Sequence, residues 1–213
     1  MYLQYLPAGP IDTNTVIVGC SKTHKAAVFD VPAGSASAIL ELLSLHQLKV
    51  DKILITHSHW DHIGDLAALK KELGVPVYVH GEDAENIRKP GSDGLPLFFP
   101  IEGVQPDGFL EEGQKMSVGE IDFQVIHTPG HTPGCVCFWF PKEAVLISGD
   151  TLFQGSMGRL DLPTARPKLM GGSLKKLAQL PSNTRVIPGH GQETTIGAES
   201  TTLRLSNRTD PLD

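Results

Sequence analysis

Four side chains of the kinds that bind metals lie within six residues of one another. They are His57, His59, Asp61 and His62, and they closely follow the apolar run 53–55. Neutral imidazole and carboxylate are ligands that Zn²⁺, Fe²⁺ and Mn²⁺ accept. The alternative is a group of surface histidines beside a helix cap, but four such residues at a chain junction are costly unless something binds there. The spacing therefore predicts a metal site.

Two elements must hold these side chains. The β-branched run 53–55 is typical of a buried strand, and the alternation of an extended chain places His57 and His59 on the same side. Asp61 suits the N-cap of a helix over residues 62–73, which carries a stripe of leucines. We therefore expect the four side chains to converge from a strand end and a helix start.

Four more ligand-type residues lie at the ends of predicted strands, before loops rich in glycine or proline: Asp30, His131, Asp150 and His190. This repetition predicts a metal site along one edge of a sheet. Asp30 could accept the ring N–H of a ligand histidine, or it could be an ordinary turn residue, and the sequence leaves both open. His80 and His127 we expect to be structural.

The rest of the chain alternates predicted strands with amphipathic helices in two halves. The expected strands are 15–19, 26–31, 75–80, 115–118, 121–128, 135–140, 144–147 and 185–187, and the expected helices are 35–46, 82–88 and 169–180. We expect residues 194–213 to form a short docked helix and a frayed tail. In the long connection 81–114, Phe98 and Phe99 could line an acyl pocket or could plug the core beneath the loop.

Length and composition fit one soluble domain over residues 1–213. The chain is 40% hydrophobic and 20% charged, and its net charge of −6 argues against broad binding to nucleic acid or acidic membranes. No apolar run approaches the ~18 residues of a membrane span. Residues 1–10 do not resemble a secretory signal, and three cysteines cannot all pair. We therefore expect a cytoplasmic protein.

The ordered motifs resemble those of the metallo-β-lactamase superfamily. They are His57-x-His59-x-Asp61-His62, His131 in Gly-His-Thr-Pro-Gly, Asp150 in Ser-Gly-Asp and His190 in Gly-His-Gly. The resemblance runs over about residues 14–199 and is most marked with the short glyoxalase II-like (hydroxyacylglutathione hydrolase-like) branch. It implies an α+β fold, a four-layer αββα sandwich with its metal site at one edge of the two sheets.

The resemblance also implies two divalent metal ions, with zinc most expected and iron or manganese as alternatives. It assigns His57, His59 and His131 to one ion, Asp61, His62 and His190 to the other, and Asp150 to a bridge between them. Two cations roughly 3.5–4 Å apart can lower the pKa of a shared water to near 7 and polarise a carbonyl oxygen. The hydroxide so formed would attack a thioester carbonyl, and Asp61 would orient it.

The implied activity is hydrolysis of a small-molecule thioester, possibly linked to glutathione. Within residues 153–163, a stretch resembling Gly-x-Gly-Arg-x-Asp places Arg159 where it could bind a glutathione carboxylate, or could pair with Asp161 and shape the loop. Few residues follow His190, whereas full-length glyoxalase II enzymes bind glutathione with a helical C-terminal domain. Glutathione recognition, like the oligomeric state, therefore stays open.

Other activities of the same fold fit parts of the pattern. A mononuclear-iron persulfide dioxygenase would use His57, His131 and Asp150, and lactone or phosphodiester hydrolases remain alternatives. Asp150 stands where secreted β-lactamases usually carry cysteine, and His59 stands where flavodiiron oxygen reductases carry glutamate, which disfavours both. A metal-binding protein without turnover is the alternative from another class.

Overall fold

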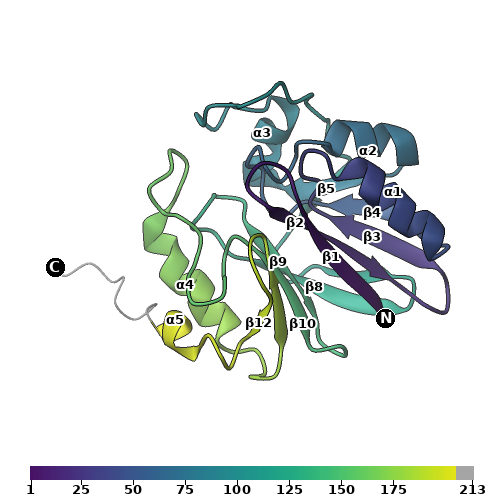
Figure 1. The fold of residues 1–213 in the computed structure, drawn as a ribbon. Coiled ribbons are helices and arrows are strands. Elements are labelled where there is room, and N and C mark those ends of the chain that lie inside the picture. Colours follow the sequence, from purple (N-terminus) through teal and green to yellow (C-terminus); the bar gives the residue numbers. More distant parts are fainter. Residues whose placement is uncertain (205–213) are drawn as a thin grey trace.

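Two six-stranded sheets pack face to face, and helices cover their outer faces (Figure 1). The computed structural model describes residues 1–204, so the predicted frayed tail at 205–213 lies outside the described residues. The arrangement is the predicted α+β four-layer sandwich.

The first sheet combines an antiparallel and a parallel half. Its strands, in spatial order, are β1 (Tyr2–Ala8), β2 (Thr13–Gly19), β3 (Lys25–Phe29), β4 (Lys49–Leu54), β5 (Val77–His80) and β6 (Gly108–Leu110). Strands β1 to β3 pair antiparallel, and β3 to β6 pair parallel. The predicted hairpin between β2 and β3 is confirmed.

The second sheet is mostly antiparallel, as its short connections require. Its strands, in spatial order, are β12 (Thr194–Thr195), β11 (Arg185–Pro188), β10 (Val145–Gly149), β9 (Val136–Phe140), β8 (Ile121–His127) and β7 (Lys115–Val118). One pair, β10 with β11, is parallel. The chain reaches β11 from β10 through α4 (Pro167–Leu177), the crossover that a parallel pair needs.

The core consists of three buried clusters, one between the sheets and one under each helical layer. Phe29, Phe123, Phe138 and Phe140 fill much of the inter-sheet cluster. Helices α1 (Ala36–Leu45), α2 (Leu66–Leu73) and α3 (Ala84–Arg88), the last preceded by the single turn η1 (Gly81–Asp83), lie over the first sheet. Helices α4 and α5 (Ser200–Arg204) lie over the second. In the part of the chain described, no helix is long and apolar enough to cross a membrane.

One local prediction is wrong, and three strands, β1, β6 and β12, were not predicted. Helix α2 begins at Leu66 with Asp65 as its N-cap, not at residue 62 with Asp61 as the cap. Asp61 cannot serve as the cap because its carboxylate accepts a hydrogen bond from Thr13 and faces two histidines. Strand β1 was not predicted, because it is a half-buried edge strand containing Pro7 and shows no clear alternation.

Parallel pairing brings the chemistry-bearing residues to one edge. In the β3–β4 pair Phe29 lies opposite Leu54, so Asp30 and the segment after Leu54 leave the sheet side by side. In the β10–β11 pair Gly149 lies opposite Pro188, so Asp150 and His190 also emerge together. In both sheets, candidate ligand residues therefore follow neighbouring strand ends, as the sequence predicted.

Candidate metal centre

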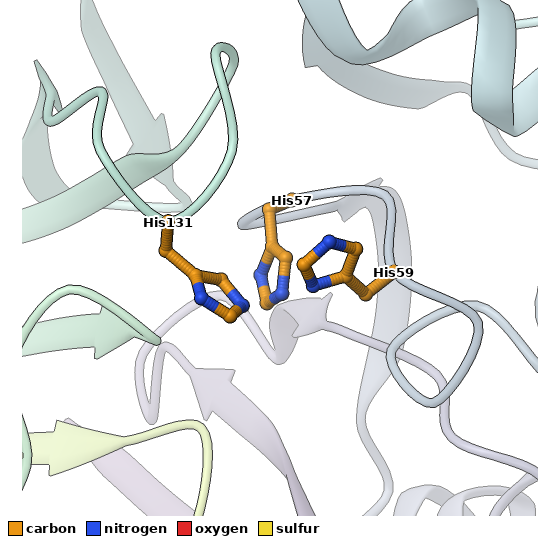
Figure 2. Close-up of side chains that lie close together, drawn as sticks. All are labelled: His57, His59 and His131. Carbon is orange, nitrogen blue, oxygen red and sulfur yellow. The ribbon is translucent and has the colours of Figure 1, made fainter. Parts of the chain in front are cut away.

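Three histidines from two loops form the first cluster at this edge. His57 and His59, which follow β4, meet His131, which follows β8. Their ring centroids lie 4.8 Å apart for His57 and His59, 4.9 Å for His57 and His131, and 4.5 Å for His59 and His131. Figure 2 shows the three rings converging on a common point.

A second cluster joins the loop between β4 and α2 to the loop that follows β11. Asp61 and His62 meet His190, which follows β11. Asp61 Oδ2 lies 3.3 Å from His62 Nε2 and 3.2 Å from His190 Nε2. In each cluster the potential ligand atoms all lie within 4.8 Å of one another.

Asp150 faces both clusters. Its Oδ1 lies 3.4 Å from His62 Nε2, and its Oδ2 lies 3.4 Å from His131 Nε2 and 3.6 Å from His190 Nε2. Gly189 makes this approach possible, because a Cβ at that position would collide with Asp150 Oδ1 and lie 2.8 Å from His62 Cε1. The structure thus brings all seven predicted ligand residues together, with Asp150 placed for a bridge.

Hydrogen bonds on the far side of the rings fix their tautomers. The Nδ1 of His131 lies 2.8 Å from the carbonyl oxygen of Arg159, and that of His190 lies 3.2 Å from the carbonyl of Ile11. A carbonyl can only accept, so both Nδ1 atoms carry a hydrogen, and in the neutral ring, the form that binds metal, the Nε2 atom keeps a free lone pair. Free Nε2 lone pairs are what metal coordination requires.

Asp30 fixes the tautomers of two more histidines, His62 directly and His57 through Thr56. Its Oδ2 lies 2.8 Å from His62 Nδ1 and accepts the Thr56 hydroxyl at 2.7 Å. Because the single hydroxyl hydrogen of Thr56 goes to Asp30, its oxygen accepts from His57 Nδ1, 3.1 Å away. Of the two interpretations left open for Asp30, the structure supports acceptance from a site histidine.

Five buried atoms of the site have no hydrogen-bond partner among the described residues. They are the Nε2 atoms of His57, His59, His62 and His131, together with Asp150 Oδ1. Buried polar atoms are normally satisfied, so their concentration at one point needs an explanation. Divalent cations would satisfy all five at once, and the imidazole and carboxylate donor set suits them. The residues therefore fit a two-metal group.

Burial and neighbouring charges set different pKa values in the two clusters. Burial lowers the pKa of His57 and brings that of His59 to about 3, and nearby histidines add to both effects. Burial also disfavours charge on His62, but Asp61, Asp30 and Asp150 outweigh it and raise the pKa of His62.

Asp61 and Asp150 also raise the pKa of His190, the third residue of the second cluster. Burial opposes charge on His190, yet its hydrogen bond with Asp61 and the charge of Asp150 raise its pKa. Burial by itself would raise the pKa of Asp61 and Asp150, but the adjacent histidines lower both. Without metal, protons therefore gather on the second cluster, while His57 and His59 stay neutral.

The first two residues of β2, both polar, were not predicted to belong to the site. Thr13 donates its hydroxyl to Asp61 Oδ2 at 2.8 Å, and Asn14 donates to the carbonyls of Pro188 and Gly191, 3.0 Å away in each case. They hold Asp61 and the loop of His190 in place. The sequence signal was a polar run, residues 13–15, directly before the apolar part of the strand, and the structure buries all three side chains.

Asp83 was also missed, although it connects the two ligand loops. It is buried, with Oδ2 accepting from Ser58 N at 2.8 Å and from the Thr132 hydroxyl at 2.9 Å, and Oδ1 accepting from Gly134 N at 2.7 Å. Burial raises its pKa against the effect of these bonds. Ser58 lies between His57 and His59, so Asp83 ties their loop to that of His131.

A cleft of about 740 Å³ opens over the two clusters. Arg159, predicted to bind substrate, lies in its lining. The guanidinium of Arg159 is paired with Asp161 through two hydrogen bonds of 2.9 and 2.8 Å, and both side chains are 70% exposed. The pair that the sequence left as an alternative thus exists, but so exposed a pair is weak enough for another carboxylate to replace.

Comparison with known proteins identifies the family. A family model described as the Metallo-beta-lactamase superfamily matches residues 8–190. Hydroxyacylglutathione hydrolase GloC of Haemophilus influenzae is 31% identical over 208 residues, which cover 93% of this chain and 95% of GloC.

Two solved structures are similar over nearly the whole length. The BLEG-1 B3 metallo-beta-lactamase is 38% identical, with a TM-score of 0.86, over 94% of this chain and 97% of its own. The protein TTHA1623, solved in a di-iron-bound form, is 40% identical, with a TM-score of 0.80, over 93% of this chain and 98% of its own.

Proposed function

Because the chain belongs to the metallo-beta-lactamase superfamily, we propose that it is a metal-dependent hydrolase that cleaves thioesters, of the hydroxyacylglutathione hydrolase type. The observation that carries the proposal is the convergence of buried, unpartnered imidazole and carboxylate atoms beneath an open cleft. The similarity to GloC supports the thioester as the bond that is cleaved. The partner is then a small-molecule thioester, and the proposed compartment is the cytoplasm.

The proposed metal ligands are the seven residues of the two clusters. His57, His59 and His131 would hold one divalent ion, Asp61, His62 and His190 would hold the other, and Asp150 would contact both. The ions would supply Lewis acidity, which lowers the pKa of water to about 7 and polarises a carbonyl oxygen. TTHA1623 in its di-iron form supports iron beside zinc and manganese as candidates.

The protein's own groups position the reactants. Asp61 is held by Thr13 with its carboxylate between His62 and His190, where it can accept a hydrogen from an attacking water and orient it. At the cleft, Arg159 can exchange Asp161 for a carboxylate on the thiol portion of the substrate. The attack needs no side-chain nucleophile.

The test is thiol release by purified, metal-analysed protein. We expect hydrolysis of S-D-lactoylglutathione with kcat/KM of about 10⁴ M⁻¹s⁻¹ or more, the lower end for working enzymes. Oxygen uptake with glutathione persulfide, recorded in parallel, tests the dioxygenase alternative. Background rates on all thioesters, with metal bound, would reject the proposal.

A β-lactam is the second candidate substrate, because the BLEG-1 B3 metallo-beta-lactamase is similar over nearly the whole chain. Both reactions place a water at a carbonyl carbon, so one site can serve either. A chromogenic cephalosporin belongs in the same assay. A kcat/KM for it above that for every thioester would replace the thioesterase assignment.

A further inference from the structure

Apart from the metal-ligand candidates, the cleft is lined mostly by apolar side chains. Five of its lining residues belong to the two clusters, and beyond them Ser156 and Arg159 are its polar members. The apolar members are Ile11, Trp60, Leu95, Pro96, Phe98, Phe153, Met157 and Leu162. A volume of about 740 Å³ is far more than an acetyl or lactoyl group needs and is ordinary for a drug-sized ligand.

One wall is an aromatic platform next to a cluster histidine. Trp60 directly follows His59 and is largely buried, with its ring centroid 5.0 Å from that of Phe98 and 5.7 Å from that of Phe99. Phe98 is 72% exposed, on the loop after α3. Covering such an exposed phenylalanine in a cleft with an apolar group is favourable, because it removes apolar surface from water.

A second apolar part of the cleft lining lies beside the second cluster. Phe153 lies with its ring centroid 6.0 Å from that of His190. Met157 belongs to the same loop and can adapt its unbranched side chain to irregular partners. A group entering the cleft would therefore meet hydrocarbon beside each of the two clusters.

We propose that the cleft selects thioesters whose acyl group is a bulky, uncharged hydrocarbon, seated against Trp60 and Phe98 with its carbonyl over the two clusters. This rests on the proposed function and adds its substrate class. A charged acyl group would lose water against these walls without a partner, whereas a phenyl or branched alkyl group would bury apolar area on both walls. The polar thiol portion would lie toward the exposed Arg159.

The test compares two thioesters that differ only in the acyl group. Acetyl and phenylacetyl N-acetylcysteamine share an uncharged leaving thiol, so their ratio of kcat/KM reports the acyl site alone. Since one methylene in an apolar pocket is worth about 10–200-fold, we expect phenylacetyl to be preferred by at least ~10-fold. Phe98→Ala should remove most of this preference, by lowering kcat/KM for the phenylacetyl compound much more than for the acetyl compound.

Phe109→Ala is the matched control, because Phe109 on β6 is also exposed, at 49%, and does not line the cleft. Both residues are at the surface, so both variants should fold. No preference in the natural protein, or a preference that Phe98→Ala and Phe109→Ala alter equally, would overturn the inference.

A binding measurement separates this inference from the proposed function. The thioethers S-phenethyl- and S-ethyl-N-acetylcysteamine cannot be hydrolysed, and calorimetry gives their affinities for the metal-loaded protein. Tighter binding of the phenethyl compound that Phe98→Ala abolishes would support the apolar site even if no thioester were cleaved. Equal affinities would overturn it even if lactoylglutathione were hydrolysed rapidly.

Discussion

At the scale of single residues, the site is defined by which ring nitrogen each histidine offers. Asp30, Thr56 and two backbone carbonyls accept the Nδ1 hydrogens, so in the neutral rings four Nε2 atoms point inward with free lone pairs. Motif spacing predicted the residues but not these partners, because hydrogen-bond acceptors from Ile11 and Arg159 depend on tertiary contacts. Asp30 alone among the partners was foreseen as an acceptor, from its place at a strand end.

The two clusters should respond differently to pH. The pKa of His62 and that of His190 are raised, so a metal entering their cluster must displace protons, and its affinity should rise as pH rises. The pKa values of His57 and His59 are lowered, so their sites are free of protons near neutrality.

Calorimetry from pH 6 to 8, in buffers of different ionisation enthalpy, measures this difference. One metal equivalent should lose affinity steeply toward pH 6 and release protons on binding, while the other should change little. Equal pH dependence of both equivalents would contradict the assignment.

Arg159 is the second test at this scale. Arg159→Ala should raise KM for a glutathione thioester about tenfold, because a charge-assisted hydrogen bond contributes about 1.5–3 kcal/mol. It should leave a small uncharged aryl ester unaffected. Asp161→Asn, which frees the guanidinium, should lower KM for the glutathione thioester. Equal losses on both substrates in Arg159→Ala would instead indicate an arginine that only shapes the loop.

At the scale of elements, the site exists because strand ends meet. Apolar runs and turn residues predicted most strands, and parallel neighbours were enough to bring Asp150 beside His190. A helix boundary that depends on a tertiary partner of one side chain was not predicted correctly. Asp61 has the residue type of a helix N-cap, but its carboxylate accepts a hydrogen bond from Thr13 instead. Asp83 carried no signal of its own, because an acidic residue at a helix start is ordinary.

Asp83 should act on the site through the two loops that it joins. In Asp83→Asn the amide oxygen keeps some of the three donated bonds while the NH₂ group meets a donor, so the loops of His59 and His131 loosen. We expect metal affinity to fall about 10–100-fold, as for other groups that orient metal ligands.

The matched control is Asp122→Asn, because Asp122 is an exposed carboxylate paired with Lys142. Competition with a fluorescent chelator gives both affinities. Unchanged metal affinity in Asp83→Asn, with the folded state intact, would show that Asp83 stabilises only the fold.

At the scale of the whole molecule, each half of the sandwich supplies part of each cluster. The half built on the first sheet supplies His57, His59, Asp61 and His62, and the other half supplies His131, Asp150 and His190. Family motifs predicted this arrangement because their order along the chain follows the strand ends. The composition of the cleft walls was less predictable: Phe98 was foreseen only as one of two options, since loop conformation decides which side of a loop faces the site.

Metal removal should therefore weaken the sandwich as well as the site. Metal at 1,000 times its dissociation constant stabilises the folded state by about 4 kcal/mol, and for a chain of this size each kcal/mol shifts Tm by about 2–4 °C. We expect chelation to lower Tm by about 10 °C and added metal to restore it. An unchanged Tm after verified removal would mean that the ions do not hold the halves together.

Two metal ions at the joined strand ends should drive thioester hydrolysis. The most direct test is the rate of S-D-lactoylglutathione hydrolysis as metal is returned to chelated protein one equivalent at a time, with Asp150→Asn as the variant that lacks a bridging carboxylate. We expect full activity only as the second equivalent binds, and a loss of at least ~100-fold in Asp150→Asn. Full activity at one equivalent, or an Asp150→Asn variant as active as the natural chain, would contradict it.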